Sequence, residues 1–182
     1  MRAWYLALLG ETEPAAADAV EDALSSHFLA PVRRLRLPEP EFAFDPGSGQ
    51  YGSIPMLQEL LERRPDDAWK VLGLTGRDLF IPMLTFVFGQ AQLNGGTALV
   101  SLARLRQEFY SLPPDPGLLV LRARKEALHE AGHLMGLVHC QDMRCAMSLS
   151  TGIRHLDGKG ASYCEKCAAT IGRRRTAERT EV

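Results

Sequence analysis

The stretch His129-Glu130-Ala131-Gly132-His133-Leu134-Met135-Gly136-Leu137-Val138-His139 carries three of the five histidines of this 182-residue chain. Upstream of it, Asp115-Pro116 offers a capping carboxylate and a first-turn proline, so we predict a helix from Pro116 to Met135, about 30 Å long. Residues four apart on a helix share a face, which allows the imidazoles of His129 and His133 to reach one ion at the ~2.0–2.1 Å that zinc requires.

Gly136 decides whether a third histidine can join that ion. In a continued helix His139 would lie about 9 Å along the axis from His133, too far to share a ligand. Glycine readily adopts the left-handed conformation that ends a helix, so we expect the chain to turn at Gly136 and return His139 to the ion. The alternative is three solvated or core histidines beside a helix-ending glycine.

Three protein nitrogens on zinc leave a fourth position for water, whose pKa zinc lowers towards ~7. Glu130 is rotated by about 100° from His129 around the helix and is therefore expected to face that water. A carboxylate there can take up a proton and later deliver it to a leaving amine. This pattern, HExxHxxGxxH, predicts hydrolysis of peptide bonds with Glu130 as general base and then general acid.

All four cysteines follow this stretch, with the spacing Cys140-x4-Cys145-x18-Cys164-x2-Cys167. Four thiolates in two close pairs fit a closed tetrahedral site, so we predict a second, structural zinc that holds a small C-terminal lobe together. The chain would then bind two zinc ions. Buried free thiols, or a redox pair at Cys164 and Cys167, are the alternatives.

The first hundred residues alternate strand and helix signals, which predicts an α/β fold with a mostly parallel sheet. Two strand-like runs, 85–93 and 97–105, are joined by Asn94-Gly95-Gly96 and should form a hairpin that adds an antiparallel edge strand. We expect an exposed loop over 38–50 and a closing helix from Cys167 to Arg175. The other predicted elements are strands at 3–9, 32–37 and 69–74 and helices that begin near Pro14 and Ser53-Pro55.

Composition narrows the class of protein. A net charge of −1 and 46% hydrophobic residues argue for one globular domain and against a nucleic-acid or membrane-surface protein. The apolar start of the chain meets Glu11 and Glu13 too early for a secretion signal, so we expect a cytoplasmic protein. The run Arg173-Arg174-Arg175 is expected to be a solvated helix face; a zinc-knuckle protein that binds nucleic acid is the weakest alternative.

The histidine stretch, followed by Cys140, Cys145-x-Met147 and Cys164-x2-Cys167, resembles the archaemetzincins, a branch of the metzincin zinc metalloproteases. The resemblance implies a metzincin-like fold: one domain with an upper part over 1–139 and a lower part over 140–182. It also implies that Met147 forms an apolar floor beneath the histidines. The substrate would lie along an edge strand at Phe86 to Gln92, with Phe86, Val87, Phe88, Gly89 and Gln90 as the candidate binding residues.

The sequence departs from secreted metzincins in two respects. No cysteine precedes Cys140 that could block the zinc from within the chain, and Leu149 stands where some members have a tyrosine ligand. His155 and Tyr163 are candidates for stabilising the oxyanion, or else packing residues. The leading hypothesis is thus a monomeric zinc peptidase that acts on peptides or proteins. The alternative is a weak or inactive peptide-binding module with two structural zinc ions.

Overall fold

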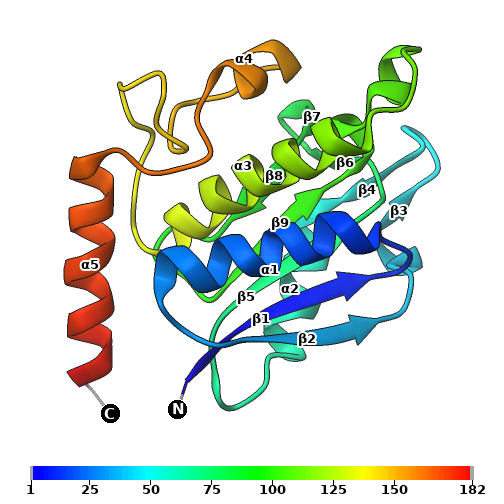
Figure 1. Cartoon of the computed structure of the whole chain (residues 1–182). Coiled ribbons are helices and arrows are strands. Elements are labelled where there is room, and N and C mark those ends of the chain that lie inside the picture. Colours follow the sequence, from blue (N-terminus) through cyan, green and yellow to red (C-terminus); the bar gives the residue numbers. More distant parts are fainter. Residues whose placement is uncertain (1, 181–182) are drawn as a thin grey trace.

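A computed structural model of the chain describes residues 2–180. Its main sheet has five strands in the order β2-β1-β5-β9-β8 (Figure 1). The first four strands are parallel, and β8 pairs antiparallel with β9 at the edge. The predicted α/β fold with an antiparallel edge strand is confirmed. The strands are β1 (Ala3–Leu9), β2 (Val32–Leu37), β5 (Ala68–Thr75), β8 (Gly89–Ala91) and β9 (Thr97–Ser101).

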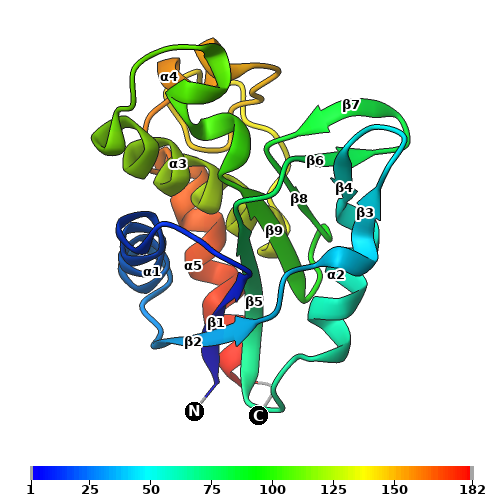
Figure 2. The same ribbon diagram turned by 90° about the vertical axis from the view of Figure 1, so that its right-hand side faces the viewer.

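Helices cover both faces of this sheet, which explains why β1 is apolar at every position. Trp4, Leu6 and Leu8 belong to the larger core under α1 and α3, whereas the alternate side chains of Tyr5 and Leu9 belong to a second core under α2. Figure 2 shows α1 and α3 on one side of the sheet and α2 on the other. The helices are α1 (Pro14–Phe28), α2 (Ser53–Glu62) and α3 (Pro116–Leu134).

A second, four-stranded sheet was not predicted. It has the order β3-β4-β6-β7 and lies beside the β8 edge of the main sheet (Figure 2). The expected single strand over 85–93 was wrong, because the chain changes sheets at the buried Phe88, between β7 and β8. The expected loop over 38–50 also contributes strands. The four strands are β3 (Phe44–Asp45), β4 (Gln50–Gly52), β6 (Leu79–Ile81) and β7 (Leu84–Val87).

The strand expected over 97–105 ends at Ser101, where the Ser101 hydroxyl accepts a bond from the amide of Ala103 and donates one to the carbonyl of Arg77. These side-chain bonds replace the sheet ladder and start a turn. The 3₁₀ helices of the chain are η1 (Glu41–Ala43), η2 (Ala103–Leu105) and η3 (Gln107–Tyr110).

After α3 the chain crosses back over the molecule with little regular structure and ends in a long helix (Figure 1). The predicted helix from Cys167 to Arg175 lies inside the longer α5 (Glu165–Thr180), and the short α4 (Ile153–Gly158) was not predicted. No helix among the described residues is long and apolar enough to span a membrane.

Candidate metal centre and cleft

The cap and the end of α3 place the histidines. The Asp115 carboxylate accepts a hydrogen bond from the Leu118 amide at 2.9 Å, as a capping residue does. At the other end Gly136 has φ +77°, and the Leu137 amide donates to the carbonyl of Gly132. The predicted left-handed turn is confirmed. It returns the chain so that the ring of His139 lies 5.2 Å from that of His129, centre to centre.

The nitrogens of His129, His133 and His139 that could bind one metal ion all lie within 4.8 Å of one another. The Nδ1 atoms of His129 and His133 donate to the carbonyls of Ala146 and Leu137, at 2.9 and 2.8 Å. Their Nε2 atoms are then unprotonated and face each other at 3.2 Å. Two lone pairs at that distance favour a cation between them, so this donor set fits zinc.

Burial keeps the three imidazoles neutral, which is the form that binds metal. It lowers the pKa of His129 to about 3, and the nearby ammonium of Lys159 acts in the same direction. Burial also lowers the pKa of His133 and of His139, the most exposed of the three. At neutral pH no proton therefore has to leave before a metal ion binds.

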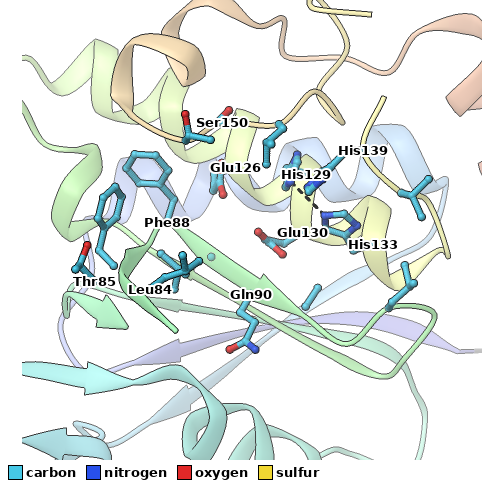
Figure 3. Close-up of a pocket in the computed structure, with 18 residues that line it drawn as sticks. Leu84, Thr85, Phe88, Gln90, Glu126, His129, Glu130, His133, His139 and Ser150 are labelled. Carbon is cyan, nitrogen blue, oxygen red and sulfur yellow. Dashed lines mark hydrogen bonds between the residues drawn. The ribbon is translucent and has the colours of Figure 1, made fainter. Parts of the chain in front are cut away.

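Glu130 is only 4% exposed and faces the same cleft (Figure 3). Burial, followed by the negative charge of Glu126, raises its pKa well above the ordinary value. Gly89 of β8 packs directly against it: a Cβ added at Gly89 would come within 2.7 Å of Glu130 Cγ. No pattern in the sequence around Gly89 predicts that this glycine makes room for Glu130.

Met147 is fully buried and packs on α3 at Gly132, between His129 and His133 in the sequence. A Cβ at Gly132 would overlap the Met147 sulfur, so only glycine permits this approach. From the sequence alone we assigned no role to Gly132. Its place between the two helical histidines was the available signal of close packing.

The four cysteine sulfurs of Cys140, Cys145, Cys164 and Cys167 also lie within 4.8 Å of one another. The amides of Met147 and Cys164 donate to the Cys145 sulfur, at 3.5 and 3.3 Å. Such donors stabilise a thiolate, so this cluster fits a closed four-thiolate zinc site.

A cleft of about 680 Å³ opens beside the histidines. The predicted residues Phe86 to Gln90 all line it, but the Gln90 side chain turns away to accept a hydrogen bond from Ser53. His155 and Tyr163 do not line it, and the Tyr163 hydroxyl donates to the Leu128 carbonyl. Ala91, within the predicted substrate strand, also lines it, and the lining residues that the sequence analysis missed are Leu84, Thr85, Leu93, Glu126, Val138, Leu149, Ser150 and Thr151.

The arginine run lies far along α5 from the cysteines. Arg174 donates to the side chain of Asn94 at 3.1 Å, and Arg173 donates to Thr170 on its own helix. The backbone amide of Asn94 donates a hydrogen bond to the carbonyl of His133. Arg174 thus contacts the turn beside the candidate metal centre.

The fold and the two clusters together define a member of the zinc metallopeptidases. Residues 26–173 match the family model described as Peptidase family M54. This chain belongs to that family, the archaemetzincins.

Named archaemetzincins resemble the chain over most of its length. The archaemetzincin of Methanocaldococcus jannaschii is 48% identical over 128 residues, which are 70% of this chain and 69% of that protein. The archaemetzincin of Methanopyrus kandleri is 41% identical over 142 residues, 78% of this chain and 77% of the relative.

Solved structures agree. The crystal structure of the Methanopyrus kandleri archaemetzincin has a TM-score of 0.84 at 35% identity and covers 96% of both chains. That of a zinc-dependent peptidase from Methanocorpusculum labreanum has a TM-score of 0.82 at 31% identity, over 93% of this chain and all of the other.

Proposed function

We propose that this chain is a zinc-dependent peptidase in which Glu130 moves the protons of the reaction. The observation that carries the proposal is the convergence of three neutral imidazoles next to a buried carboxylate, at one side of an open cleft. Membership in a peptidase family supports it.

His129, His133 and His139 would hold the catalytic zinc, which when bound polarises the attacking water and the peptide carbonyl. Glu130 would accept a proton from that water and deliver it to the leaving amine. Its burial suits this role, because a carboxyl group with a raised pKa can hold the proton between the two steps.

The substrate would lie extended along β8. This strand pairs with β9 on one side only, and Gly89 and Ala91 line the cleft. A peptide can therefore add as a further strand through backbone hydrogen bonds. Side chains at alternate positions of the peptide would then point towards α3, where Glu130 lies.

The cysteine cluster would hold a structural zinc that fixes the segment after His139. Cys140 directly follows His139, and Cys145 lies two residues before Met147. We further propose that the chain acts as a single domain, with 1–139 above the cleft and 140–182 below it. Peptides or proteins are the proposed substrates and a monomer is the proposed form.

Replacement of Glu130 by Gln tests this function. We expect Glu130→Gln to retain two zinc ions per chain by elemental analysis and to lose cleavage of a peptide library. Glu62→Gln, an exposed helical position, is the matched control and should cleave as the parent does. A parent that binds peptides without chelator-sensitive cleavage, or a Glu130→Gln variant that cleaves at the parent's rate, contradicts the proposal.

A further inference from the structure

Glu126 lies one helical turn before Glu130 on α3 and lines the same cleft. It is 4% exposed, and within the described residues its Oε2 atom has no hydrogen-bond donor. Its ion pair with the buried ammonium of Lys159 is 3.7 Å long, more than a hydrogen bond. A buried carboxylate oxygen without a donor is costly, so a donor that arrives from the cleft would stabilise Glu126.

Ser150, three residues after Met147, presents a second atom of this kind. Its Oγ is buried and has no hydrogen-bond partner in the part of the chain that the structure describes. Ser150 and Glu126 both line the cleft, and in the view of Figure 3 both are drawn on the side of His129 away from His133. Two polar groups from different segments thus face one part of the cleft.

The wall of this part of the cleft is apolar and well supported. Phe88 is buried and packs edge-on against Phe86, with ring centres 5.3 Å apart. The guanidinium of Arg104 lies 4.2 Å from the centre of the Phe86 ring. The same guanidinium donates two hydrogen bonds to the Asp78 carboxylate. Aromatic walls of this kind accept the methylene groups of a long side chain.

The charges point to a cation. Among the described residues that line the cleft there is no lysine or arginine, whereas Glu126 and Glu130 are both acidic. Lys159 interacts with both carboxylates from the interior, so one ammonium faces two of them. The proposed zinc lies beside Glu130, so Glu126, one turn away along α3, is the carboxylate left for a cationic group that arrives from the cleft.

We propose that Glu126 and Ser150 form a specificity subsite for a lysine or arginine side chain of the substrate. This inference rests on the proposed peptidase function. Glu126 is about 6 Å along the helix axis from Glu130, and an extended peptide advances about 3.3 Å per residue. The subsite therefore takes a residue about two positions from the bond that is cleaved, whose ammonium or guanidinium donates to Glu126 Oε2 and Ser150 Oγ.

Peptides that differ only in this residue test the inference. The parent should cleave the lysine or arginine peptide with a kcat/KM on the order of 10- to 100-fold above that of the norleucine peptide. Glu126→Gln and Ser150→Ala should each reduce this ratio, that is, lower kcat/KM for the lysine or arginine peptide more than for the norleucine peptide. Glu62→Gln, which removes an exposed carboxylate, should keep the ratio. Equal cleavage of both peptides by the parent, or an unchanged ratio in Glu126→Gln, overturns the subsite.

Glu126→Gln alone leaves Lys159 unpaired in the interior, which can destabilise the fold. The double variant Glu126→Gln/Lys159→Met removes both charges and should show the same loss of preference. Calorimetric binding of both peptides to zinc-loaded Glu130→Gln protein examines the subsite without turnover. Tighter binding of the lysine peptide supports the subsite and equal binding contradicts it, whereas a parent that cleaves no peptide contradicts the peptidase function.

Discussion

A substitution at Gly89 tests the position of Glu130 without replacing Glu130 or any candidate metal ligand. A Cβ at this position would lie 2.7 Å from both Glu130 Cγ and the Leu99 carbonyl oxygen, about 0.7 Å less than the 3.4 Å of ordinary contact. The Leu99 carbonyl belongs to the backbone of β9, which pairs with β8, so an added Cβ must shift β8 locally and displace Glu130. We therefore expect Gly89→Ala to displace the proposed base.

The size of the effect follows from this displacement. A misplacement of about 1 Å can cost roughly 100-fold in rate, so kcat should fall by about that factor. Overpacking costs about 1–3 kcal/mol, and the gain of replacing a strand glycine returns about 0.5–1 kcal/mol. The variant should therefore fold, melt slightly lower and retain two zinc ions.

The assay combines peptide cleavage, thermal melting and elemental analysis. Gly158→Ala is the control, because a Cβ there meets no atom within 4 Å. A crystal structure of Gly89→Ala gives a second measure, the position of the Glu130 carboxylate. Cleavage at the parent's rate with Glu130 in place would refute the reasoning.

Three other predictions concern the metals and their histidines. Gly136→Ala must hold a side chain at φ +77°, which costs about 1–2 kcal/mol. The variant should melt at a lower temperature and release the catalytic zinc faster to a chelator. Unchanged release would count against the turn as the support of His139. Cys167→Ser should lower the zinc content from two ions to one, whereas two tightly retained ions would count against Cys167 as a zinc ligand. In the metal-free protein the pKa of His129 is about 3, compared with 6.5 in the unfolded chain. Between these two pH values the unfolded state binds more protons than the folded state. The free energy of unfolding should therefore fall as the pH drops from 6.5 towards 3. Urea unfolding across that range should show a weaker pH dependence in His129→Gln, and equal slopes would contradict the shift.

The sequence by itself determined the candidate metal ligands and the turn that unites them. The histidines four residues apart, the turn at Gly136 and the spacing of the cysteines are local relations, which helix and turn geometry dictate within a few residues. The alternating elements likewise predicted the main sheet and its antiparallel edge.

Tertiary packing decided the rest. The assignment of β7 and β8 to different sheets, the room that Gly89 leaves for Glu130, and the position of Glu126 and Ser150 in one cleft all depend on segments distant in the sequence. Local sequence patterns do not determine such contacts, because they depend on how the helices and the two sheets pack against one another at close-packed density. The sequence therefore predicts which side chains can bind zinc, whereas the shape and charge of the cleft beside them follow only from the three-dimensional packing.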